Sequence, residues 1–241
     1  MFPTLMIQKP RSYSFILIGA VLTAGCGNPV QETAAHKIAD ALPRVLGPAA
    51  HYDVQVNGDP FALTRGRARA VHIQGEGVQL SPTLTLDTLD INAKDIAFDP
   101  KNRKLTHIGE TTFTASLGQT NLDRCLAASK PLLPGLVVTL LPDKVEAHVP
   151  VTFLGLQTTA ALAGSFRPNA DDPSKLDFMT SGAQLGSVPL PAGLINLATE
   201  SVNPVIDLSG LKAPLTVTDS SVTDSRIILS GTASLQDLVQ P

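Results

Sequence analysis

The sequence predicts an α+β protein with a long, highly curved antiparallel β-sheet that is wrapped around, or closed by, two to three amphipathic helices. Three observations lead to this expectation. Apolar side chains alternate with polar ones through most of the chain after residue 51, as is typical of strands. Turn-forming residues divide these stretches into hairpins. Three other segments carry apolar side chains at helical spacing.

The first helix is predicted over residues 32–46. Its apolar residues share one face: Ile38, Leu42, Val45 and Leu46. Gly47 and Pro48 follow and end the helix. Pro43 predicts a kink or an early end, because proline lacks the N–H that a helical hydrogen bond needs.

Long strands are predicted next, at residues 52–56, 67–80, 84–98 and 103–117. A turn at 57–60, an irregular or helical link at 61–66 and a hairpin turn at 99–102 connect them. The longest approach ~14 residues, where ~5–6 is common. Their apolar phase slips, because Leu84 and Leu86 have one parity while Leu89 and Ile91 have the other. Such slips predict β-bulges, which bend a sheet.

The second half of the chain continues the alternation of strands and helices. Strands are predicted at 135–141, 144–153 and 154–166, a surface loop at 167–174 and a further strand from 176. Helices are predicted over 120–129 and 191–206. A closing hairpin of residues 215–218 and 222–234 is predicted to turn at Asp219 and Ser220. All these strands are expected in one curved sheet.

The N-terminus carries a targeting signal. Lys9 and Arg11 precede an uncharged apolar segment, and small residues lead from it to Cys26. This order is that of a secretory signal with its cleavage site, and a cysteine directly after that site resembles the lipobox of bacterial lipoproteins. The resemblance implies that residues 1–25 are removed and that the Cys26 thiol is diacylated. The alternative is an ordinary secretory signal with an incidental cysteine.

The same signal predicts where the protein is located. The apolar run is shorter than the ~20 residues that span a bilayer, so the expected anchor is lipid, in the cell envelope. Gly27 follows the cysteine, which by analogy with lipoproteins of two-membrane bacteria favours the outer membrane, facing the periplasm. Residues 26–33 are expected to be a tether, and residues 34–236 a single domain.

Composition argues against several classes of function. The net charge is −3, and −5 once Lys9 and Arg11 are removed, so there is no basic field for nucleic acid. Charged residues make up only 16 % of the chain, against a typical ~25 %, which leaves much aliphatic surface for a large core or an apolar cavity. Cys125 is expected to be a buried, inert thiol.

Motifs for catalysis and metal binding are missing. The five histidines (His36, His51, His72, His107 and His148) show no metal-ligand spacing, and the motifs of zinc peptidases, serine hydrolases and nucleotide-binding proteins do not occur. The sequence therefore predicts no catalytic residue, no metal and no cofactor, and the protein is not expected to be an enzyme.

Short motifs in a fixed order identify a family. They are VQVNGDPF at 54–61, Leu63 and Gly66, Val71 and Ile73, LDI at 89–91, KDI at 94–96, TNLD at 120–123, AGSF at 163–166, PLP at 189–191, PLTV at 214–217 and LSG at 229–231. Over residues 35–235 the chain resembles the LmeA-like phospholipid-binding family of bacterial envelope proteins. The resemblance implies an envelope protein that binds phospholipid or glycolipid. The predicted fold also resembles the tubular lipid-binding superfamily.

The residues themselves support a lipid cavity. A curved aliphatic sheet closed by helices can hold acyl chains, and alternation along the strands nominates the side chains that would line it: Val71, Ile73, Leu89, Ile91, Phe113, Leu117, Val149, Val151 and Phe153. Plain core packing is the alternative for each. Arg65, Arg67 and Arg69 alternate on a strand and are candidates for a lipid headgroup, or simply for a solvated outer face.

Two other functions remain open from the sequence. One is a structural or adaptor lipoprotein with a filled core, which would expose an apolar patch to a protein partner. The other is an envelope enzyme, which would need clustered carboxylates or a Ser/His set in a cleft.

Overall fold

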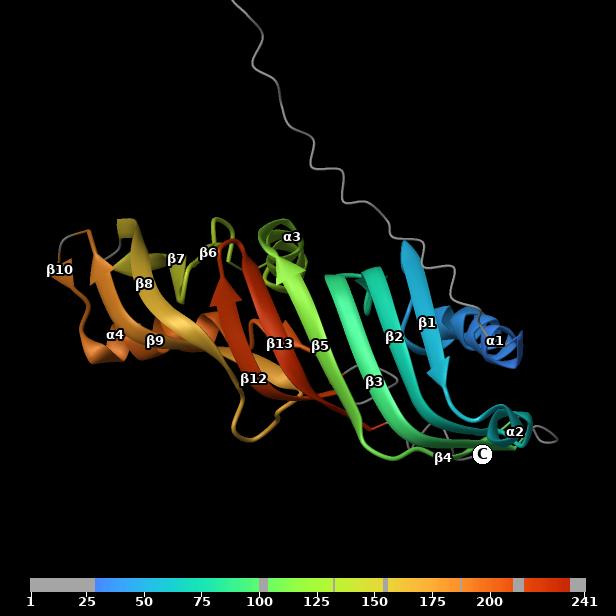
Figure 1. Cartoon of the computed structure of the whole chain (residues 1–241). Coiled ribbons are helices and arrows are strands. Elements are labelled where there is room, and N and C mark those ends of the chain that lie inside the picture. Colours follow the sequence, from blue (N-terminus) through green and yellow to red (C-terminus); the bar gives the residue numbers. More distant parts are fainter. Residues whose placement is uncertain are drawn as a thin grey trace, which may run out of the picture.

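The computed structural model describes residues 29–99, 104–131, 133–153, 156–186, 188–209 and 215–234 (Figure 1). The predicted signal sequence and Cys26 lie outside these residues. The described chain forms antiparallel sheets with helices, so the predicted α+β class is confirmed. The prediction of one sheet is wrong, because the strands form two sheets that lie side by side and give the molecule an elongated shape.

The first sheet combines the N-terminal strands with the last hairpin of the described chain. Its strands are β1 (His51–Asn57), β2 (Arg67–Gln79), β3 (Thr85–Asp99), β4 (Lys104–His107), β5 (Thr111–Gly118), β12 (Leu215–Thr223) and β13 (Arg226–Ala233). They are ordered β1-β2-β3-β5-β13-β12, with β4 beside β3. Because β13 pairs with β5, the last described strands complete the sheet that the N-terminal strands begin.

The second sheet is formed by the middle of the chain. Its strands are β6 (Val137–Leu141), β7 (Lys144–Phe153), β8 (Leu156–Pro168), β9 (Lys175–Leu185), β10 (Val188–Pro189) and β11 (Ile206–Asp207). They are ordered β10-β9-β8-β7-β6, with β11 beside β9. A helix and a loop separate β5 from β6, and β5 pairs with β13 instead, so the ladder of the first sheet does not continue into the second.

The two sheets meet where β12 packs against β8. Ser220 donates a hydrogen bond from Oγ to the carbonyl of Phe166 at 2.9 Å, and the N–H of Val217 donates to the carbonyl of Pro173 at 2.9 Å. The rings of Phe166 and Phe178 pack edge to face, with centroids 6.1 Å apart. One cluster of buried apolar side chains extends through both sheets, so they share a core.

The helices are α1 (Pro29–Val45), α2 (Pro60–Thr64), α3 (Gln119–Ser129) and α4 (Ala192–Val202). Helix α1 packs against β1 and begins three residues before the predicted start, so part of the predicted tether is helical. Pro29 allows this early start, because the first helical position needs no N–H. Helix α3 lies within one residue of its prediction.

Helix α4 is shorter than the predicted helix over 191–206 and ends at Val202. The next residue, Asn203, turns its side chain to β9. It accepts a hydrogen bond from the N–H of Phe178 at 2.7 Å and donates one to the carbonyl of the same residue at 3.1 Å. These bonds fix the helix end on the sheet, and Ile206 then joins β9 as a strand.

The first sheet bends at two rungs between β2 and β3. The ladder keeps one register, but the rungs joining Gly77 to Asp87 and Arg69 to Asp95 are missing. Gly77 and Asp95 have positive φ values of 60° and 51°. At the first of these points the parity of the buried residues changes, from Leu86 to Leu89 on β3 and from Gly75 to Val78 on β2. The phase slip is therefore real, but left-handed residues cause it rather than the predicted bulges in this pair.

Two further boundaries differ from prediction. The strand expected over 103–117 is interrupted at residues 108–110, opposite Asp95, so β4 and β5 are separate. The last hairpin turns at Asp224 and Ser225 instead of residues 219–220. Strand β12 continues through a bulge between Val217 and Asp219. The polar residues at 219–220 have the composition of a turn, but they remain paired with β13.

Candidate functional site: a pocket at the end of the first helix

Apolar residues form rows across the inner face of the first sheet. Ladder pairing places one row across β1, β2, β3, β5 and β13, namely Val54, Ile73, Ile91, Phe113 and Gly231. The next row contains Tyr52, Gly75, Leu89, Ala115 and Leu229. Leu89 and Ile91 lie in neighbouring rows on β3, with Gly75 and Ala115 beside Leu89 and Ile73 and Phe113 beside Ile91.

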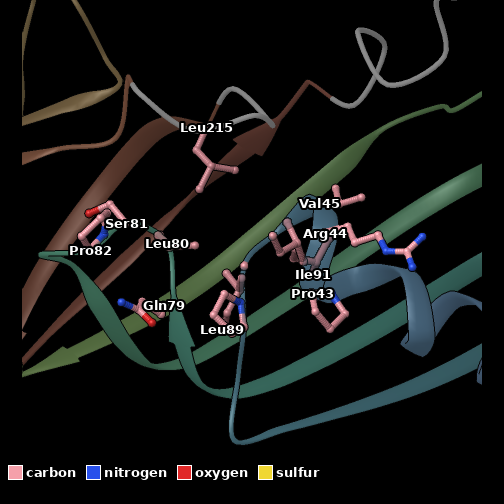
Figure 2. Close-up of a pocket in the computed structure, with 13 residues that line it drawn as sticks. Pro43, Arg44, Val45, Gln79, Leu80, Ser81, Pro82, Leu89, Ile91 and Leu215 are labelled. Atoms are coloured by element: carbon pink, nitrogen blue, oxygen red, sulfur yellow. The ribbon is translucent and has the colours of Figure 1, made fainter.

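A pocket of about 420 Å³ lies between this face and the end of α1 (Figure 2). Leu89 and Ile91 form its floor. Its apolar walls come from three segments far apart in the sequence: Pro43, Val45, Leu46 and Pro48 around the end of α1, Leu80 and Pro82 in the β2–β3 turn, and Leu215 on β12. Its polar side chains are Arg44, Gln79 and Ser81. Such a pocket suits an aliphatic ligand with a polar end.

The wall formed by α1 is held in place around Gly47. This residue has a φ of 110°, and a Cβ there would lie 2.1 Å from the carbonyl oxygen of Gln79, so only glycine permits this approach. The N–H of Gln79 donates to the carbonyl of Pro48 at 2.8 Å. The Tyr52 hydroxyl donates to the carbonyl of Gly47 at 2.8 Å. Helix end and turn are thus fixed to each other across the pocket.

Tyr52 should give this wall a measurable pH dependence. Burial raises the pKa of the Tyr52 hydroxyl from 10.0 to about 12. Because the folded-state pKa is the higher one, the neutral phenol stabilises the fold fully below the unfolded pKa of 10.0, and this contribution is lost as the pH rises through about 12. We expect the free energy of unfolding to fall over this range in the native chain, and to fall less in Tyr52→Phe.

The titration of Tyr52 can be observed directly. Tyr13 lies in the predicted signal, so Tyr52 is the one tyrosine expected in the processed chain. Phenolate absorbance should show a midpoint near pH 12 in the folded protein and near 10.0 in urea. A folded-state midpoint equal to the one in urea would contradict the burial of this hydroxyl at the pocket wall.

The side chains predicted to contact lipid fall into two groups. Leu89 and Ile91 line the pocket and are 2 % and 1 % exposed, so they form a closed floor rather than an open wall. The others with described side chains are buried in the core cluster and do not line the pocket: Val71, Ile73, Phe113, Leu117 and Val149. The side chains of Val151 and Phe153 lie outside the described part of the structure.

Sequence reasoning missed the pocket walls. The sequence predicts Pro43 as a helix kink, Val45 as a residue of the apolar helix face and Leu215 as a strand residue, but it predicts no part in a lipid site for them or for the β2–β3 turn. The usable signal was Gly47 with Pro48, which marks the helix end that overhangs the floor. That this end meets Leu215 follows only from the return of the chain to the first sheet.

The three predicted headgroup arginines lie at another place, around α2. Arg65, Arg67 and Arg69 are exposed, and none forms an ion pair with a described residue. Arg67 and Arg69 line a second pocket of about 500 Å³ with further residues of α2, β3 and β4. They do not line the pocket at the end of α1, so the structure does not bring them to the same place as Leu89 and Ile91.

Three other features of the described residues bear on function, namely metal-ligand groups, the free cysteine and membrane-spanning helices. No group of three or more His, Cys, Asp or Glu side chains is gathered there as metal ligands would be. Cys125 is buried, as predicted, and burial raises the pKa of its thiol. Of the described helices, none is both long and apolar enough to cross a membrane.

Comparison with known proteins assigns the chain to a family. A family model described as LmeA-like phospholipid-binding matches residues 29–232. No curated protein and no solved structure matches the chain. The matched span runs from the first residue of α1 into β13 and so contains the whole pocket, including Leu215. The chain therefore belongs to the LmeA-like phospholipid-binding family.

Proposed function

We propose that this protein is a lipid-anchored envelope protein that binds phospholipid, or a related lipid such as a glycolipid, with acyl-chain carbons in the pocket at the end of α1. Its role is lipid transport or envelope maintenance, without catalysis. The observation that carries the proposal is the apolar pocket over Leu89 and Ile91, in a chain of a phospholipid-binding family.

The chemistry of the pocket supports acyl-chain binding. Its volume of about 420 Å³ lies within the usual range of roughly 300–1,000 Å³ for ligand pockets. Each methylene buried against such walls contributes ~0.8 kcal/mol, so affinity does not depend on a specific polar contact. Arg44, Gln79 and Ser81 place polar groups on the lining, where a lipid headgroup can meet them.

Helix α1 is suited to give way to a ligand over the part that precedes its end, which Gly47 and Tyr52 hold in place. Leu42 is its single buried residue, and all of its other residues are exposed or half-buried. The floor beneath it is nearly closed, so a long acyl chain must displace part of this wall. A helix with few buried contacts opens at low free-energy cost.

The proposal is tested by asking whether the purified protein carries lipid. A soluble form beginning at residue 27 keeps every described element, because α1 begins at Pro29. We expect native mass spectra and lipid extracts of this form to show close to one phospholipid per chain, or uptake of one from liposomes. A lipid-free mass without uptake would contradict the proposal. It would favour an adaptor, for which the exposed Val188 and Leu197 offer apolar contacts.

A further inference from the structure

We propose that the end of the molecule formed by Phe61, Arg65, Arg67, Arg69 and Phe98 docks on an anionic membrane surface. We call these five residues the arginine tip. The inference extends the proposed function, because one of its arguments uses the predicted anchor at Cys26. The docking surface is separate from the lipid pocket.

Two exposed phenylalanines identify the tip. Phe61 on α2 is 78 % exposed, and Phe98 at the end of β3 is 40 % exposed. The N–H of Phe98 donates to the carbonyl of Gly66 at 2.7 Å, directly after α2, so the two residues come from neighbouring segments. Figure 1 shows α2 and β4 together at this end of the first sheet. Exposed aromatic rings at an element's end are suited to enter the boundary between headgroups and acyl chains.

The sequence and backbone of α2 hold Phe61 outward. Pro60 occupies the first turn, and the Asp59 carboxylate accepts hydrogen bonds from the N–H groups of Phe61 and Ala62 at 2.9 and 3.1 Å. This cap fixes the start of a five-residue helix that buries none of its own residues. The short helix therefore presents Phe61 to solvent instead of packing it into the core.

Three arginines lie on the segments next to these phenylalanines. Arg65 ends α2, and Arg67 and Arg69 lie at the start of β2, all exposed and without an ion pair to any described residue. The carboxylates nearby are Asp59, which caps α2, Asp95, which lines the same pocket as Arg67 and Arg69, and Asp99, which follows Phe98 at the end of β3. These arginines have no ion pair with the part of the chain that the structure describes, and in a chain of net charge −3 they provide a local basic surface that attracts anionic headgroups.

The start of the chain leads to the same end of the molecule. Gln31, in the first turn of α1, donates from Nε2 to the carbonyl of Gly58 at 3.2 Å, and Gly58 lies in the turn before α2. Cys26 precedes Pro29 by three residues, a distance of at most ~11 Å of extended chain. An acyl anchor on Cys26 therefore holds the arginine tip close to the membrane.

The lipid pocket lies at the other end of α1. This helix has 17 residues, which corresponds to a length of about 25 Å. Docking by the tip therefore leaves the pocket away from the leaflet that holds the anchor. Membrane docking and lipid binding involve different residues, so each can fail without the other.

A single tryptophan tests the docking. The chain contains none, so Phe61→Trp in the full chain gives one fluorescent reporter. The processed protein is reconstituted in vesicles of equal parts phosphatidylcholine and phosphatidylglycerol. We expect its emission to shift to shorter wavelength and to be quenched by brominated acyl chains. The matched control is Leu197→Trp, 63 % exposed on α4 at the opposite end of the molecule, which should show neither effect.

Charge reversal tests the arginines in the same reporter chain. Replacing Arg65, Arg67 and Arg69 by Glu should reduce bromine quenching of the Phe61→Trp chain at least several-fold. Quenching of the Phe61→Trp chain with its native arginines should fall to a similar extent in vesicles of phosphatidylcholine alone. Reversing Arg124, Arg167 and Arg226, three exposed arginines elsewhere, is the matched control and should leave quenching unchanged.

Three results would overturn docking by the tip. They are equal quenching of the two reporters, equal loss in the two charge-reversed chains, and a wavelength shift without bromine quenching, which would indicate a protein contact such as a second copy. The anchor and the pocket have readouts of their own, namely the mass of the N-terminal peptide and the lipid extract. If Cys26 carries no lipid, added vesicles still report docking.

Discussion

Replacing Val45 by tryptophan should lower phospholipid uptake by at least about tenfold, a loss of ~1.4 kcal/mol of binding free energy. Val45 is the last residue of α1, is half-buried and belongs to the pocket lining. An indole at this position occupies space that the proposed acyl chain needs. Little core packing is lost, because Val45 lies at the edge of the buried cluster.

The measurement separates a blocked pocket from a damaged fold. Uptake of phospholipid from liposomes is measured beside the thermal unfolding midpoint, which should change by only a few degrees. Val188→Trp is the matched control, since Val188 is 64 % exposed on β10 in the other sheet and should bind lipid normally. Normal uptake by Val45→Trp would mean that lipid binds elsewhere, and the proposed site would then be wrong.

Local pattern was sufficient to predict most of the long strands and the pocket-floor residues Leu89 and Ile91. Alternation placed Leu89 and Ile91 on the inner face, and both lie there. The same pattern does not distinguish a floor residue from a core residue, because both need an apolar side chain facing inward. Phe113 has the same parity signal and is buried away from the pocket lining. An inward-facing residue lines the pocket or belongs to the core depending on which segments pack over it, and those segments are distant in the sequence.

The prediction of one sheet instead of two failed for the same reason, because long-range contacts decide which strands pair. Most hairpins were predictable from their own residues, although the last one turns at Asp224 and Ser225, but the partner of an outer strand lies far away in the sequence. Strand β5 pairs with β13, more than a hundred residues later, and this pairing leaves β6 to start another sheet. The pocket also depends on this long-range pairing, because Leu215 lies near the end of α1 only when the last hairpin joins the first sheet.

Backbone conformation explains the phase slip that the sequence assigned to a β-bulge. The phase slip between Leu86 and Leu89 was visible in the sequence, but a bulge and a left-handed residue produce the same slip. The structure has the second, with Gly77 at a φ of 60° opposite Asp87. Asp87 then bonds outside the ladder, where its carboxylate accepts the N–H of Gly118 at 2.7 Å at the start of α3. A polar strand residue thus positions a helix, which alternation does not reveal.

The largest loss of stability is expected from Gly231→Ala, at about 3 kcal/mol or more. Gly231 faces Val217 beside the bulge in β12, and it belongs to one of the short motifs that resemble the family. A Cβ there would lie 2.0 Å from the carbonyl oxygen of Thr216 and 2.9 Å from the Phe113 ring. The carbonyl belongs to a strand that hydrogen bonds hold in place, so the clash can be relieved only by parting β12 from β13.

Gly193→Ala is the matched control, because nothing lies within 4 Å of a Cβ at this position on α4. There the same substitution should stabilise the protein by about 0.5–1 kcal/mol, since alanine favours a helix more than glycine does. Urea unfolding followed by circular dichroism gives both values. A cost at Gly231 below about 1 kcal/mol would show that β12 can shift at the bulge. In that case Leu215, on the same strand, would be a mobile wall of the lipid pocket rather than a fixed one.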